Sequence, residues 1–265
     1  MMRTTNALAI LLLSVISLNA AAPRIVAHRG SSVEAPENTI PAFALAWKQG
    51  SDAIEADFHL TKDGEIVCIH DKNTKKVSGT NLVVNASTLV ELRKLDVSAK
   101  HEGFKGVTIP TIAEVFSTVP QGKLIYIEIK CGPEIIPALL DALEKSELTK
   151  EQVVIITFKE NVIQELKAKA PHYKASWLCS FKKQKTGEMK PSLESVLETL
   201  KRIQANGLSS NTAIPHALIE AVIKQGYDWH VWTVDDAKTA RRMAALGAKS
   251  ITTNKPEFLR NALVE

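Results

Sequence analysis

The chain has 265 residues, of which 45% are apolar and 23% charged, so it can bury the core of one globular domain of ordinary size. This composition excludes a disordered or collagen-like chain. The 33 basic residues exceed the 29 acidic ones by only 4 and lie scattered among them, so we expect no nucleic-acid partner. The 3 cysteines are too few for a disulfide scaffold and allow one disulfide at most.

The N-terminal residues have the pattern of an export signal. A positive charge at Arg3 is followed by an apolar run over residues 7–18 and by small residues at 20–22. We therefore predict a cleaved secretory signal over residues 1–20 and a mature chain, residues 21–265, that is periplasmic or extracellular and has no stable membrane span. An N-terminal membrane anchor is the alternative, but it needs a longer apolar run.

The mature chain alternates short β-rich runs with amphipathic runs of helical period, which predicts βα units. The predicted strands cover residues 24–27, 53–60, 123–130, 152–158, 173–179, 207–210, 229–234 and 249–252. The predicted helices cover residues 39–49, 112–119, 134–148, 161–170, 193–205, 216–225, 236–246 and 257–263. Such an alternation of strands and helices at this length predicts a (β/α)8 TIM barrel. A doubly wound sheet is the alternative, although no G-x-G-x-x-G motif follows the first strand.

Residues 72–110 interrupt this alternation between the second strand and its helix. The segment is polar and weakly helical around residues 89–95. In a TIM barrel this connection emerges on the face where active sites lie, so we predict a small cap over the substrate mouth. A solvated loop without function is the alternative.

Acidic residues lie on one face of two predicted strands. Glu55 and Asp57 are two residues apart, so both side chains point into the predicted barrel. Two buried carboxylates repel each other unless a cation neutralises them, which predicts a metal site. Glu128 and Lys130 repeat the arrangement, and their simple pairing is the alternative. Oxygen ligands without clustered Cys or His favour Ca²⁺ or Mg²⁺ over zinc.

Two histidines are expected beside this metal. His28 and His70 end neighbouring extended segments, and such a pair suits general acid–base cleavage of a phosphoester. Arg29 adds a planar fork of donors for phosphate oxygens. Trp232, near the end of the seventh strand, either packs against the substrate or belongs to the core.

Several short motifs carry a resemblance to a known family. They are V-A-H-R-G at 26–30, A-P-E-N-T at 35–39, E-A-D-F-H-L-T-K-D-G at 55–64, H-D at 70–71, I-P-T-I at 109–112, I-E-I-K at 127–130 and V-W-T-V at 231–234. In this order they resemble the glycerophosphodiester phosphodiesterase family, from about residue 24 to the end of the chain. The resemblance implies a (β/α)8 barrel that hydrolyses small glycerophosphodiesters to an alcohol and sn-glycerol 3-phosphate.

The resemblance also implies a role for each matching residue. The family's general acid and base match His28 and His70. Its ligands of one divalent cation match Glu55, Asp57 and Glu128. Its phosphate contacts match Arg29 and Lys130, and its glycerol-pocket residue matches Trp232.

Two positions depart from the family pattern. Asn254 stands where the family commonly has Asp, and Thr157 where it commonly has Ser. Because Asn caps a helix about as well as Asp, we expect the first change to affect the structure little while removing one negative charge near the mouth.

Other functions remain open for the same site. A lysophospholipase D or a phospholipase C-like enzyme would need an exposed apolar rim, but Phe104 is the only Phe, Tyr or Trp in the insertion. A secreted protein that binds phosphodiesters without turnover would need no acid–base pair of histidines. Water and the substrate's own 2-hydroxyl both remain possible as the attacking group. We expect a monomer or a homodimer.

Overall fold

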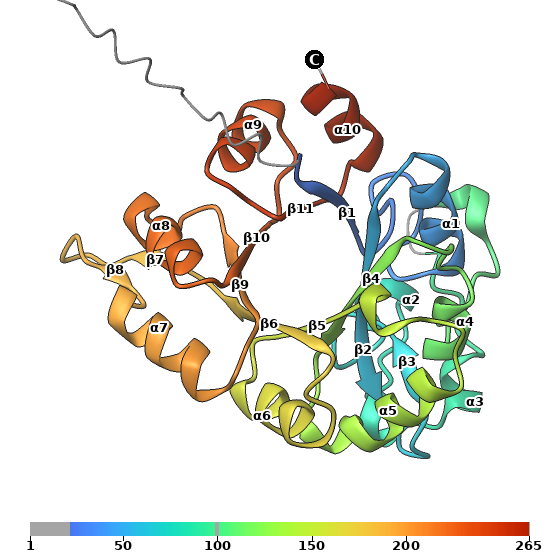
Figure 1. Cartoon of the computed structure of the whole chain (residues 1–265). Helices are drawn as coiled ribbons and strands as arrows, with labels where there is room; N and C mark the ends of the chain where they lie inside the picture. The colour runs from blue at the N-terminus through green and yellow to red at the C-terminus, as the bar shows by residue number, and fades with distance from the viewer. Residues whose placement is uncertain (1–21, 99–100, 265) are drawn as a thin grey trace, which may run out of the picture.

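A closed ring of parallel strands forms the centre of the molecule (Figure 1). The computed structural model describes residues 22–98 and 101–264, so the predicted signal over residues 1–20 lies outside the described residues. The ring consists of β1 (Arg24–His28), β2 (Ala53–Leu60), β4 (Leu124–Ile129), β5 (Val153–Thr157), β6 (Lys174–Cys179), β9 (Gly207–Asn211), β10 (Asp228–Trp232) and β11 (Ser250–Thr253). It closes because β1 pairs in parallel with both β2 and β11. This closure confirms the TIM barrel and rules out the open, doubly wound sheet.

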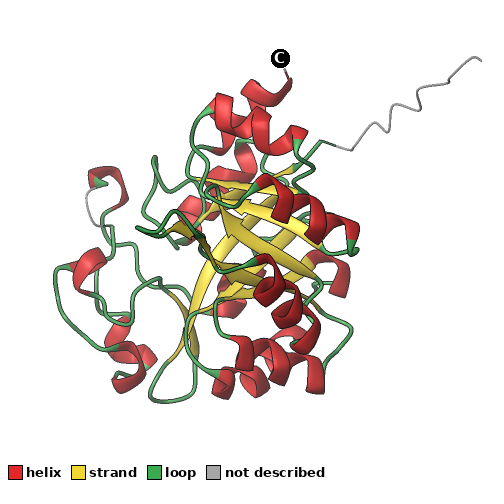
Figure 2. Cartoon of the chain, turned by 90° about the vertical axis from the view of Figure 1, so that its left-hand side faces the viewer, coloured by secondary structure: helices red, strands yellow, loops and turns green. Residues whose placement is uncertain are grey.

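Helices surround the strands on the outside (Figure 2). They are α1 (Ile40–Lys48), α4 (Ile112–Phe116), α5 (Ile136–Glu144), α6 (Glu160–Lys169), α7 (Leu193–Arg202), α8 (His216–Lys224), α9 (Ala237–Ala245) and α10 (Pro256–Val264). Alternation along each strand divides the core. In β2, Ile54, Ala56 and Phe58 are fully buried in the main core. Glu55 and Asp57 therefore point to the opposite face, into the barrel.

The predicted insertion is present and has a small core of its own. It contains α2 (Lys75–Ser78), α3 (Leu89–Leu92) and the 3-10 turns η1 (Val84–Ala86) and η2 (Glu102–Phe104). Its apolar cluster consists of Val67, Ile69, Val84, Leu92, Val97 and Ile109. The short strand β3 (Ile66–Cys68) leads into it and pairs antiparallel with β2. Ile66 and Cys68 pack in the main core while Val67 packs in the insertion, so β3 belongs to both cores.

The structure also differs from the sequence-based prediction in places. A hairpin of β7 (Lys182–Lys183) and β8 (Met189–Lys190) was not predicted, because its strands are short and lysine-rich and show no apolar alternation. The helix predicted for residues 112–119 ends at Phe116. All three cysteines, Cys68, Cys131 and Cys179, are free. Within the described residues, none of the helices has the length and apolar character needed to cross a bilayer.

Candidate active site

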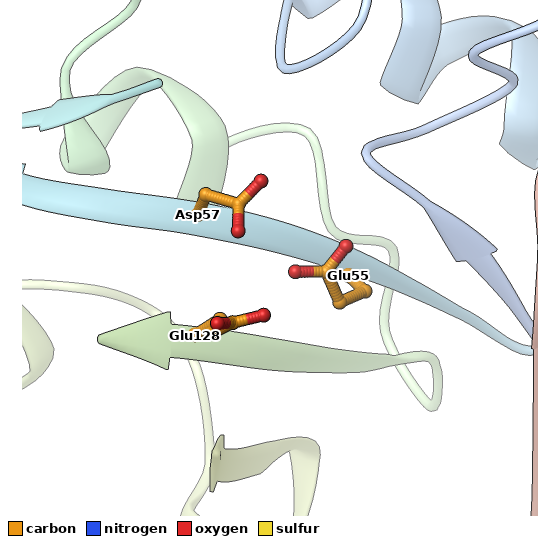
Figure 3. A group of neighbouring side chains, drawn as sticks. All are labelled: Glu55, Asp57 and Glu128. Atoms are coloured by element: carbon orange, nitrogen blue, oxygen red, sulfur yellow. The ribbon is translucent and has the colours of Figure 1, made fainter. Parts of the chain in front are cut away.

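Three carboxylates meet inside the C-terminal end of the barrel. Glu55 and Asp57 come from β2 and Glu128 from β4, and Figure 3 shows their side chains gathered in one space. Strand pairing places Asp57 directly beside Glu128. One oxygen of each residue lies within 4.8 Å of the others, and the residues are only 2%, 1% and 8% exposed. Oxygens that bind a single Ca²⁺ are separated by at most about 5 Å, so one ion can contact all three.

Two oxygens of this carboxylate cluster lack hydrogen bonds. Glu55 Oε1 and Asp57 Oδ1 are buried and accept no hydrogen bond. Burial, followed by the charges of Asp57 and Glu128, raises the pKa of Glu55 well above its ordinary value. Burial and the charge of Asp57 likewise raise the pKa of Glu128 to about 7. Burial also acts to raise the pKa of Asp57, but Arg29 and Lys130 outweigh it and hold that pKa low.

Two cations contact the carboxylates from the sides. Arg29 Nε lies 3.2 Å from Asp57 Oδ2. Lys130 Nζ lies 2.6 Å from Glu128 Oε1 and 3.4 Å from Asp57 Oδ1, so the pairing of Glu128 with Lys130 does form, but as part of the cluster. With all groups ionised, the charge is −3 + 2 = −1. An oxygen-only ligand set with buried oxygens that accept no hydrogen bond, and with a net negative charge when fully ionised, fits a hard divalent cation.

Both predicted catalytic histidines lie at this end of the barrel. His28 is the last residue of β1, and its Nε2 lies 4.0 Å from Glu55 Oε2. Burial and the neighbouring Arg29 lower the pKa of His28. His70 lies two residues after β3, just before the insertion, and its Nδ1 lies 2.7 Å from Asp71 Oδ1. His59 is buried, and its Nε2 donates to the backbone oxygen of His70 at 3.1 Å.

The loop after β1 is shaped around the carboxylates. Arg29 has φ 58° and its backbone N–H donates to Glu55 Oε2 at 3.0 Å. Gly30 follows with φ 82°, and a Cβ there would lie 2.6 Å from the backbone carbon of Ala42. Asn38, also with positive φ, donates from Nδ2 to Asp57 Oδ2 at 2.7 Å. The H-R-G and E-N-T motifs thus build the turn that holds the site.

Comparison with known proteins gives the family of this chain. Residues 28–258 match the model of the glycerophosphoryl diester phosphodiesterase family. The chain belongs to this family. A glycerophosphodiester phosphodiesterase of Caldanaerobacter subterraneus subsp. tengcongensis is 36% identical over 244 residues, which are 89% of this chain and 96% of that protein. One of Bacillus altitudinis is 30% identical over 244 residues, covering 88% of this chain and 95% of that one.

A solved structure of a phosphodiesterase is similar to this chain over most of its length. A phosphodiesterase of Oleispira antarctica, in complex with the product sn-glycerol-3-phosphate, aligns with a TM-score of 0.84 and 25% identity. The alignment covers 92% of this chain and 98% of that one.

Trp232, which the resemblance places in the glycerol pocket, lies at the C-terminal end of its strand. Trp232 ends β10 and packs above the apolar cluster inside the barrel. Its ring stands edge-on to Phe158, with 5.7 Å between ring centroids, and Phe158 is 46% exposed. The indole Nε1 is buried without a hydrogen-bond acceptor. Trp232 is therefore partly core, and it presents a free donor at the site.

Sequence reasoning gave no role to several residues that contact the candidate site. Glu37, Asn38 and Asp71 were quoted in motifs but given no role, although Glu37 Oε1 accepts from Arg29 at 3.1 Å. The interpretation of Asn254 as a helix cap was wrong. Its side chain contacts His28 and Asp235 rather than the first amide groups of α10.

Proposed function

We propose that this chain is a metal-dependent glycerophosphodiester phosphodiesterase. Its products would be an alcohol and sn-glycerol 3-phosphate. The observation that carries the proposal is the cluster of Glu55, Asp57 and Glu128 beside two histidines, Arg29 and Lys130, at the end of the barrel where TIM-barrel enzymes hold their active sites. Family membership and the product complex of the Oleispira antarctica relative support it.

Charge explains why a divalent cation belongs to this proposal. With all groups ionised and no ion bound, the cluster carries −1 and would repel an anionic phosphodiester. Glu55, Asp57 and Glu128 would hold one Ca²⁺ or Mg²⁺, which brings the local charge to +1 and matches the single negative charge of the substrate. When bound, the ion polarises the phosphate and stabilises negative charge on its oxygens.

The protein's own residues supply the remaining steps. Arg29 and Lys130 donate hydrogen bonds to phosphate oxygens as charge builds on them. One of His28 and His70 takes a proton from the attacking oxygen. The other gives a proton to the leaving alcohol oxygen while its bond to phosphorus breaks. Trp232, whose indole Nε1 is buried without an acceptor, would pack against the glycerol part of the substrate.

Product analysis tests this function directly. The purified protein is incubated with a panel of glycerophosphodiesters and lysophospholipids in Ca²⁺, Mg²⁺ or chelator, and sn-glycerol 3-phosphate is measured. We expect the protein to release sn-glycerol 3-phosphate from glycerophosphodiesters, and we expect chelator to abolish this release. Faster turnover of lysophospholipids would establish the lysophospholipase D alternative, and tight binding without turnover would establish the binding protein. Full activity in chelator would refute the requirement for a divalent cation.

We further propose that the protein is exported. The apolar run over residues 7–18 and the small residues after it support this proposal. Fractionation of expressing cells should place the protein outside the cytoplasm, shortened at its N-terminus. Retention of the full-length chain in the cytoplasm would contradict it.

A further inference from the structure

A chain of hydrogen bonds reaches His28 from the end of the neighbouring strand β11, which is distant from it in sequence. His28 Nδ1 lies 2.7 Å from Asn254 Oδ1, across 226 residues of sequence. Asn254 Nδ2 donates to Asp235 Oδ2 at 2.7 Å. The other carboxylate oxygen, Asp235 Oδ1, accepts from the Asn254 backbone N–H at 2.8 Å and from Thr253 Oγ1 at 2.9 Å. These residues follow β10 and β11, and β11 and β1 are neighbours in the barrel.

The partners of Asn254 determine which way its amide points. An ionised carboxylate only accepts hydrogen bonds, so the amide nitrogen must face Asp235. The amide oxygen then faces His28, and Ser32 Oγ donates to the same oxygen at 3.1 Å. Because this oxygen also only accepts, the proton of the neutral His28 ring must sit on Nδ1. Nε2 is left as the nitrogen that faces Glu55.

We propose that Asp235 and Asn254 are positioning residues, which hold His28 in the Nδ1-protonated form with Nε2 directed at the reacting groups. The role of these residues in turnover rests on the proposed function, whereas the position of the proton on the His28 ring does not. The same reasoning explains why Asn rather than Asp stands at this position. An aspartate at 254 would place a second carboxylate against Asp235, which already supplies the negative charge.

The substitution Asp235→Asn gives a sharp test because it keeps the size of the side chain. Thr253 and the Asn254 backbone still need an acceptor, so the new amide must present its oxygen to them and its nitrogen to Asn254. Asn254 must then turn its own oxygen toward residue 235 and its nitrogen toward His28. We therefore expect His28 to change to the Nε2-protonated form.

Ring ¹⁵N NMR in chelator at about pH 8, where histidines are neutral, measures this form without any turnover. The His28 signals are assigned by their loss in His28→Gln. The wild type should show a protonated Nδ1 and a bare Nε2, and Asp235→Asn should show the reverse. An unchanged ring form in Asp235→Asn would overturn the proposal. Asp236→Asn is the matched control, because Asp236 caps α9 through Thr239 and faces no histidine. It should leave the ring form and turnover as in the wild type.

Turnover gives the second readout. Asp235→Asn and Asn254→Ala should each lower kcat about tenfold to a hundredfold, with KM within about threefold. The double variant Asp235→Asn with Asn254→Asp exchanges the two groups and again presents an acceptor to His28. It should restore the Nδ1-protonated ring and recover kcat to within about tenfold of the wild type. Failure of the double variant to restore the ring form would refute the mechanism of positioning. A wild type that cleaves no glycerophosphodiester would refute only the proposed function. NMR would still show which nitrogen of His28 carries the proton and so test the positioning role.

Discussion

The raised pKa of Glu128 makes the metal-free protein sensitive to pH. That pKa is about 7 in the folded protein against an ordinary value of 4.5. A carboxyl whose pKa is raised by folding stabilises the folded state fully below its unfolded pKa, and this stability is lost as pH rises through the folded pKa. At about 1.4 kcal/mol per pH unit, the interval from 4.5 to about 7 corresponds to roughly 3 kcal/mol. For a domain of this size the loss lowers Tm by roughly 6–12 °C.

The neighbouring carboxyls leave the sign of this effect unchanged. The pKa of Glu55 is also raised, so its contribution is lost in the same direction. The pKa of Asp57 is lowered from 3.8, so its contribution changes only at more acidic pH. Between pH 4.5 and 7 the stabilising contribution of the two glutamates in chelator should therefore fall. Buried histidines with lowered pKa, such as His28 and His230, act in the opposite direction, so the contribution of Glu128 is measured as the difference between the wild type and Glu128→Gln.

Thermal unfolding in chelator and in excess Ca²⁺ or Mg²⁺ measures the effect. Because the ligands must lose their protons, the rise in Tm on adding the ion should be small near pH 5 and large near pH 8. An ion at about a hundred times its Kd adds about 2.7 kcal/mol. Relative to the wild type, Glu128→Gln should shift the change of Tm between pH 5 and pH 8 in chelator toward higher stability at pH 8, and it should reduce the ion-dependent rise. Glu151→Gln, on the exposed turn η4 (Lys150–Gln152), is the control. The same change of Tm between the two pH values in wild type and Glu128→Gln in chelator, or a full ion-dependent rise in Glu128→Gln, would refute the reasoning.

Further expected outcomes concern individual residues. His70→Ala should lower kcat about 10²–10⁴-fold with an unchanged circular dichroism spectrum, and near-wild-type release of sn-glycerol 3-phosphate would exclude His70 from proton transfer. Lys130→Met should lower kcat/KM about tenfold or more, and an unchanged value would remove Lys130 from the phosphate contacts. Gly30→Ala should cost about 2 kcal/mol or more in urea unfolding, because its Cβ would lie 2.6 Å from Ala42; wild-type stability would mean that the turn can relax.

The amino-acid pattern predicted the parts of this protein that depend on local periodicity. Alternation in β2 was enough to place Glu55 and Asp57 on the inner face, where the structure has them. Asn254 and Asp235 could not be found in this way. They meet His28 only because β11 closes the ring against β1, and no local signal marks a contact across 226 residues. The only sign in the sequence was that Asn254 stands where the family commonly has Asp, and we interpreted that difference wrongly as a change of helix cap.

The three residues of β3 have a consequence for how this enzyme could lose activity. Because Val67 packs in the insertion and its neighbours pack in the barrel, His70 stands where two cooperative units join. The smaller unit can open locally at a lower free energy than the barrel. Heating would then release His70 before the barrel melts, so inactivation would precede unfolding. By the same division, the insertion could diverge among relatives and reshape the substrate mouth while the barrel stays the same.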